Sequence, residues 1–141
     1  MTKFSYTLIF MLATSLLRAQ DITGKWKTID DETGEEKSIV EIYESDGKIY
    51  GKIVEVLNPK KKNPVCDKCE GENKGKPIVG LQIIDGLKKD DDVYNDGNIL
   101  NPSNGKVYNC RLKIDEDPNT LQVRGYIAFF YKTQYWKRVK E

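Results

Sequence analysis

Residues 38–57 read SIVEIYESDGKIYGKIVEVL, and this stretch decides the fold class. Both halves alternate apolar and polar residues, which is the period of a β-strand with one buried face. Between them stands Ser45-Asp46-Gly47, and an Asp-Gly pair between two such runs is a strong signal for a tight hairpin. The stretch therefore predicts two antiparallel strands. Gly51 in the second run would allow the bend or bulge that a barrel needs.

The same alternation continues on both sides of this hairpin and is broken by turn-forming residues. Further turn or loop segments separate the runs, and almost no helical periodicity is present. Because closure of a sheet on itself removes exposed strand edges, we expect one all-β domain, an up-and-down antiparallel barrel of about eight short strands. A flattened sandwich is the alternative. The remaining expected strands cover residues 22–29, 78–87, 93–100, 106–114, 121–129 and 133–139.

Residues 58–76, NPKKKNPVCDKCEGENKGK, interrupt the pattern and carry Cys66-Asp67-Lys68-Cys69. A zinc site would need further thiolates or histidines, and a redox pair would need a helix N-terminus at its first cysteine. A structural disulfide in an oxidising compartment fits better. The pairing stays open at this point: Cys66–Cys69 is favoured and leaves Cys110 as a buried thiol, whereas a bridge to Cys110 would tie the loop to the barrel.

The first 19 residues have the three-part layout of a secretory signal: Lys3, a largely apolar run, and Ala19 at the expected cleavage point. The apolar run is shorter than a membrane span requires. We therefore expect a signal peptide at residues 1–19 and one domain at residues 20–141. That domain would be periplasmic or secreted, with no stable membrane anchor after cleavage.

The composition narrows the classes of function. The chain has no histidine, which excludes Ser-His-Asp and Cys-His catalytic sets and histidine-based zinc or haem sites. Its net charge of +1 does not favour nucleic-acid binding. The acidic runs at 30–32 and 90–92 lack the spacing of a calcium loop, and Lys60-Lys61-Lys62 is typical of a solvated loop. We expect no cofactor, no metal and no enzyme activity.

Two short motifs at the ends of the domain resemble the closure of lipocalin-like barrels. Gly24-Lys25-Trp26 lies on the expected first strand, and Trp136-Lys137-Arg138 lies on the last. In lipocalin-like barrels a tryptophan on the first strand packs against an arginine from a late strand, so the resemblance assigns barrel closure to Gly24, Trp26 and Arg138.

A broader resemblance covers nearly all of the domain. The blocks GKW, IVEIYESDGKIYGKIV, CDKC, GLKKD, ILNPSNGKVYNC, VRGY and TQYW occur in this order and are similar to the bacterial family DUF2147. The resemblance implies a small exported lipocalin-type barrel without an established activity. One departure is that Tyr131-Lys132 precedes Thr133-Gln134 where relatives have Gly-Arg, which puts any ligand role of that arginine in doubt here.

Polar and aromatic strand residues give the candidate ligand site. An eight-strand barrel either fills with side chains or holds one small ligand, and aromatic walls with a few polar groups are typical of ligand pockets. We therefore expect binding or carriage of a small, partly apolar ligand. The alternative is a filled-barrel structural or interaction module whose tyrosines form ordinary cross-strand pairs. Alternation does not say which strand face lines the interior. The candidate residues are Trp26, Tyr50, Tyr94, Tyr108, Arg111, Arg124, Tyr126, Gln134 and Trp136.

Overall fold

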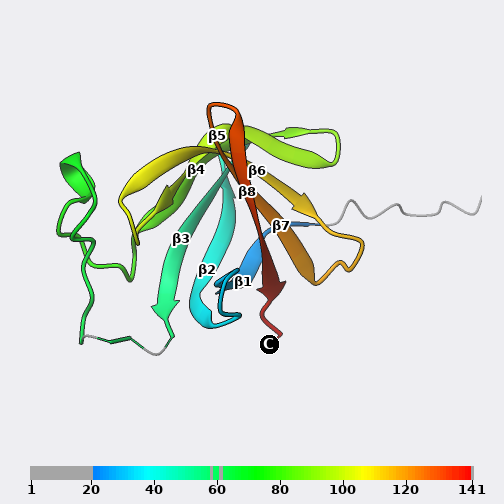
Figure 1. The fold of residues 1–141 in the computed structure, drawn as a ribbon. Helices are drawn as coiled ribbons and strands as arrows, with labels where there is room; N and C mark the ends of the chain where they lie inside the picture. The colour runs from blue at the N-terminus through cyan, green and yellow to red at the C-terminus, as the bar shows by residue number, and fades with distance from the viewer. Residues whose placement is uncertain (1–20, 58, 61, 141) are drawn as a thin grey trace, which may run out of the picture.

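The computed structural model describes residues 21–140 apart from 58 and 61; the expected signal peptide lies outside this range. Eight antiparallel strands close into one barrel in chain order, and a short 3-10 helix, η1, lies between β3 and β4 (Figure 1). The up-and-down barrel is therefore confirmed, and the sandwich alternative is wrong. The elements are β1 (Gly24–Ile29), β2 (Glu36–Ser45), β3 (Lys48–Val56), η1 (Gly71–Asn73), β4 (Gln82–Asp90), β5 (Val93–Asn101), β6 (Lys106–Ile114), β7 (Thr120–Ile127) and β8 (Phe130–Arg138).

Several strand boundaries differ from the sequence prediction, most of all at the start of β4 and at the β7–β8 turn. β4 begins at Gln82 rather than at Ile78, because Gly80 takes a positive φ of 95° and interrupts the extended chain. β7 ends at Ile127 and β8 begins at Phe130, so only two residues form the turn. Ala128 takes φ +49° in this turn, although alanine is not a residue that signals left-handed backbone.

The connections between strands alternate between the two ends of the barrel, as they must in an antiparallel meander. At the first end, which we call the closure end, lie the start of β1 and the end of β8, together with the β2–β3, β4–β5 and β6–β7 turns. At the second end, which we call the loop end, lie the β1–β2 loop, the long β3–β4 segment, the β5–β6 turn and the β7–β8 turn.

Apolar side chains from all eight strands fill the interior of the barrel. Most of them lie at alternate positions along a strand, although the neighbouring Ile83 and Ile84 of β4 are both buried, and they form one continuous core with Ile22 and residues of the β3–β4 segment. No described buried side-chain nitrogen or oxygen lacks a hydrogen-bond partner. The side chains that are less than 2% exposed are Trp26, Ile22, Ile42, Ile84, Leu87, Leu112, Leu121, Val40 and Cys66.

Arg138 joins the two ends of the chain at the closure end. Its Cζ lies 4.2 Å from the centroid of the Trp26 ring, and Trp26 pairs with Arg138 in the β1–β8 ladder. The guanidinium donates from Nη1 to the Thr23 carbonyl at 3.2 Å and from Nη2 to the Asp21 carbonyl at 2.8 Å. Gly24 lies below it with φ +116°, a conformation that glycine adopts without steric cost. Stacking and hydrogen bonding by this one cation therefore stabilise the contact between β1 and β8, which we call the seam.

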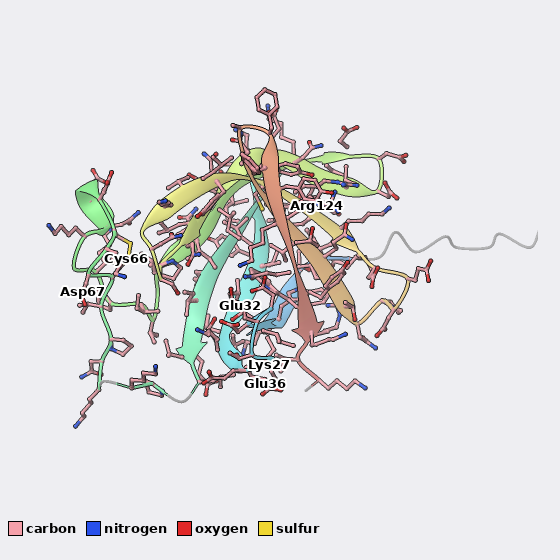
Figure 2. All side chains as sticks on the ribbon, viewed as in Figure 1. Lys27, Glu32, Glu36, Cys66, Asp67 and Arg124 are labelled. Carbon is pink, nitrogen blue, oxygen red and sulfur yellow. A yellow bond between two sulfur atoms is a disulfide. The ribbon has the colours of Figure 1, made fainter. Side chains whose placement is uncertain are left out.

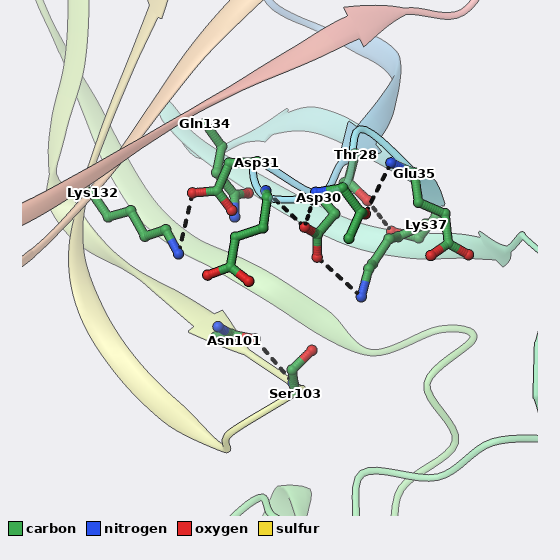
Figure 3. A network of polar contacts seen from close by, with 12 residues as sticks. Thr28, Asp30, Asp31, Glu35, Lys37, Asn101, Ser103, Lys132 and Gln134 are labelled. Atoms are coloured by element: carbon green, nitrogen blue, oxygen red, sulfur yellow. Dashed lines mark hydrogen bonds and ion pairs between the residues drawn. The ribbon is translucent and has the colours of Figure 1, made fainter.

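A polar network covers the opposite end of the same seam (Figure 3). The Asp30 carboxylate accepts hydrogen bonds from the backbone N–H groups of Thr33 and Glu32, which lower its pKa. Asp31 in the same loop pairs with Lys132 of β8 at 3.2 Å. The β1–β8 ladder contains only two residue pairs, both at the closure end. The β1–β2 loop thus lies against the part of β8 that has no strand partner on that side, a usual protection for a strand edge.

The β3–β4 segment carries the disulfide and stands to one side of the barrel (Figures 1 and 2). Cys66 and Cys69 are bonded to each other, with 5.4 Å between their Cα atoms, and both are buried. Their loop packs on the β5–β6 turn: Cys66 Sγ lies 3.8 Å from the Pro102 carbonyl oxygen, and a Cβ on Gly105 would overlap the Lys68 carbonyl. The disulfide loop is therefore docked on the barrel rather than free in solvent.

Cys110 is the free thiol and is expected to be almost unreactive in the native protein. It is 3% exposed, and burial raises the pKa of its thiol to about 12. Because the thiolate is the nucleophile, a rise from 9.0 to about 12 lowers the reactive fraction roughly a thousandfold. Iodoacetamide at pH 8 should label no cysteine before unfolding and one after unfolding without reductant, as counted by mass spectrometry. Fast native labelling would show that the thiol is accessible.

Candidate functional site

The nine candidate ligand residues lie on both faces of the barrel wall. Leu121 and Val123 are buried on β7, so the alternate residues Arg124 and Tyr126 point outward. The same reasoning on the other strands divides the set into five interior and four exterior positions. The interior residues are Trp26, Tyr94, Tyr108, Gln134 and Trp136, and the exterior residues are Tyr50, Arg111, Arg124 and Tyr126.

Several polar atoms of the interior candidates are hydrogen-bonded within the protein. The Tyr108 hydroxyl accepts a hydrogen bond from Asn104 Nδ2 at 2.8 Å, and Trp136 Nε1 donates to Gln134 Oε1 at 3.3 Å. Tyr94 packs against the core, and burial is the main cause that raises the pKa of its hydroxyl. These residues therefore behave as parts of a satisfied core.

Three of the four exterior candidates lie together. Arg111 on β6 and Arg124 on β7 are direct cross-strand partners. Tyr126 is two residues beyond Arg124 on the same face and pairs with Tyr131 of β8, with 5.8 Å between ring centroids. Tyr50 is the exception, because it lies on β3 and stacks on Tyr43. The structure thus groups Arg111, Arg124 and Tyr126 on the outer face of β6 and β7.

An irregularity in β5 hollows the surface beside these residues. The β5–β6 register passes from Tyr94–Leu112 to Gly97–Cys110, so Asn95 and Asp96 share the place opposite Arg111. This is a β-bulge, and the resulting cavity, which we call the bulge groove, has a volume of about 760 Å³. Its lining comes from four strands and includes Lys88, Lys89, Asp90, Asn95, Asp96, Asn98, Asn109, Arg111 and Tyr126.

The backbone of the bulge depends on two consecutive residues. Asp96 takes φ +67°, in the left-handed region that aspartate tolerates better than most residues. A Cβ on Gly97 would overlap the Asp85 carbonyl of β4. The groove residues on β5 were not among the sequence candidates. The signal for them is Asn95-Asp96-Gly97, a turn-type tripeptide inside an otherwise alternating strand.

The two neighbouring arginines differ in their contacts. Arg124 donates from Nε to Thr133 Oγ1 at 2.9 Å, and its Cζ lies 4.5 Å from the centroid of the Tyr131 ring. The Arg111 guanidinium makes no hydrogen bond or ion pair with any described residue. Asp96, the acidic residue of the bulge, is paired with Lys88 at 3.7 Å. The groove therefore contains a half-buried cation whose donors are available.

A second open cavity, of about 590 Å³, lies at the closure end. Glu41, Tyr43, Glu44 and Arg138 contribute to its lining. Since the Arg138 guanidinium already binds two carbonyls and the Trp26 ring, this cavity offers fewer free donors than the bulge groove.

Among the described residues, no helix is long and apolar enough to cross a membrane.

The closed eight-strand barrel and its Trp26–Arg138 contact form a lipocalin-like fold. The chain belongs to the family DUF2147, described as an uncharacterized protein conserved in bacteria, whose family model matches residues 24–138. A solved structure, reported as "Protein HP1028 from the human pathogen Helicobacter pylori belongs to the lipocalin family", is 21% identical, with a TM-score of 0.73. That match covers 86% of this chain and 84% of the other, and it shows the shared fold. Comparison with curated proteins found no match.

Proposed function

We propose that this protein is a non-catalytic binding protein that holds a small, partly apolar anion in the bulge groove. The observation that carries the proposal is the free guanidinium of Arg111, directly opposite Arg124 and next to Tyr126. Export to the periplasm or the cell exterior is part of the proposal. It is supported by the signal-like residues 1–19 and by the Cys66–Cys69 disulfide.

Electrostatics favours an anion at this position. Like charges directly opposite each other on a sheet are destabilising, and a carboxylate between Arg111 and Arg124 would relieve that repulsion. The planar guanidinium fork matches carboxylate or phosphate oxygens in a bidentate manner. The Tyr126 ring offers an apolar contact, and the amides of Asn98 and Asn109 supply both donors and acceptors. The groove thus suits a ligand with one acidic group and a small apolar body.

A second candidate is the filled-barrel interaction module. The observation in its favour is the interior, where apolar side chains occupy the barrel and every described buried polar side-chain atom is bonded. The groove proposal agrees with the same filled interior, because it places the ligand outside the barrel. The two candidates differ in whether the exported protein binds a small molecule.

Arg111→Gln is expected to weaken binding of a small aromatic carboxylate at least tenfold. The physical reason is the loss of a charge-assisted hydrogen bond, which contributes about 1.5–3 kcal/mol. Benzoate serves as the probe and the neutral benzamide as its matched analogue, with dissociation constants measured by calorimetry. Lys113→Gln is the control, because Lys113 lies two positions along β6 and pairs with Asp92 instead of lining the groove.

We expect benzoate to bind the wild type and Lys113→Gln equally and benzamide to bind neither. Equal binding of benzoate and benzamide, or full affinity in Arg111→Gln, would contradict the anion site. Mass spectrometry of the denatured, exported protein would then decide between the candidates. Repeated absence of any co-purified small molecule, together with no probe binding, would favour the interaction module.

A further inference from the structure

The most exposed apolar residues lie at one turn. We call Ile127 to Tyr131 the β7–β8 tip; it includes the two-residue turn and forms the upper edge of the barrel in Figure 1. Phe129 is 99% exposed and Phe130 is 79% exposed, while Tyr131 and Ile127 are 62% and 45% exposed. Adjacent, almost fully exposed phenylalanines are costly in water and make no contribution to the core of this barrel.

Side-chain chemistry changes in a regular order along the hairpin away from the tip. The apolar pair Phe129 and Phe130 comes first, Tyr131 with its cross-strand partner Tyr126 comes second, and Arg124 opposite Thr133 comes third. Arg124 lies over the Tyr131 ring, which links the second and third levels. Proteins in a bilayer surface show the same order: apolar rings in the acyl region, tyrosine at the interface, and cations at the phosphates.

The size and shape of the tip argue against a protein partner. A stable protein interface buries about 1,200–2,000 Å² from two complementary surfaces, and one convex two-residue turn offers few side chains toward such an area. Insertion into lipid needs no complementary shape, because each apolar side chain gains by leaving water independently of its neighbours.

We propose that the β7–β8 tip inserts reversibly into the surface of a phospholipid bilayer, with Phe129 and Phe130 among the acyl chains. Arg124 and the tyrosines then lie at head-group level. This orientation holds the loop end of the barrel and the outer face of β7 at the membrane. The inference rests on the exposed tip and does not require a ligand in the bulge groove.

The experiment uses the protein recovered after export, mixed with vesicles of phosphatidylcholine, alone or with phosphatidylglycerol. Phe129→Trp provides a reporter, since the native Trp26 and Trp136 are 0% and 2% exposed and give a constant background. We expect its emission to shift to the blue with both vesicle types and to be quenched by lipids brominated on their acyl chains. Phe129→Ser with Phe130→Ser should lower the vesicle partition coefficient roughly tenfold or more.

Tyr135→Ser is the matched control, because Tyr135 is an exposed aromatic residue on the same strand, nearer the closure end. It should bind vesicles as the wild type does, and both variants should unfold at a similar temperature to the wild type. Emission of Phe129→Trp that vesicles leave unchanged would overturn the proposal. Vesicle binding by the double serine variant at the wild-type level would also overturn it. A wild-type dimer that this variant dissociates, without vesicle binding by either, would instead identify a second copy as the occupant.

Discussion

Trp26→Ala is expected to lower the free energy of unfolding by about 3–5 kcal/mol, the range for removal of a buried large aromatic side chain. Trp26 is fully buried, and its Nε1 donates to the Ile22 carbonyl at 2.9 Å. Its ring also lies below the Arg138 guanidinium. The substitution therefore leaves a cavity, an unpaired carbonyl and a cation without its aromatic partner at the seam between the first and last strands.

Urea denaturation followed by circular dichroism measures the loss of stability. Two further variants separate the contribution of the aromatic ring from that of the hydrogen bonds. Trp26→Phe keeps an aromatic face below Arg138 but removes the indole N–H, so its loss should be smaller than that of Trp26→Ala. Arg138→Met keeps the aliphatic packing and removes the hydrogen bonds to the Asp21 and Thr23 carbonyls. A loss below about 1 kcal/mol in Trp26→Ala would mean that the seam does not hold the barrel together.

The strand pattern could be predicted because local sequence sets it, and the closed barrel followed from the number of strands and the need to remove exposed strand edges. The Asp46-Gly47 turn has positive φ at both residues, as a tight hairpin with this sequence requires. Alternation in residues 106–114 puts Cys110 and Leu112 on the buried face. The turn and the alternation depend on residues that are neighbours in the chain, so a single sequence is sufficient to predict them.

The candidate site could be predicted only in part, since it depends on which face of each strand is buried. Arg111, Arg124 and Tyr126 were identified by residue type, but alternation alone does not distinguish the interior from the exterior. The bulge that places Asn95 and Asp96 opposite Arg111 follows from pairing between strands. The exposure of the β7–β8 tip likewise could not be predicted, because the net charge and composition of the chain are averages that do not report a local apolar surface.

The second large expected effect concerns the docking of the disulfide loop, and two glycines provide a matched comparison. Gly105 and Gly34 have nearly equal φ values, +73° and +72°, so an alanine at either position takes the same unfavourable left-handed backbone. That strain costs about 1–2 kcal/mol. The two sites differ in their surroundings: nothing lies within 4 Å of a Cβ on Gly34, whereas a Cβ on Gly105 would overlap the Lys68 carbonyl.

Gly105→Ala should therefore lower the free energy of unfolding by about 2–5 kcal/mol, which is the backbone strain plus about 1–3 kcal/mol for overpacking. Gly34→Ala should lower it by the backbone strain alone. Because relief requires the loop to move off the β5–β6 turn, Gly105→Ala should also expose the buried Cys66 and Cys69. Their disulfide should then be reduced faster by dithiothreitol under native conditions, and Gly34→Ala should leave that rate unchanged. Equal losses of stability and equal reduction rates in the two variants would show that the loop is not held against the barrel. The segment would then be a tether closed on itself by Cys66–Cys69, and the close approach at Gly105 would have no role in its position.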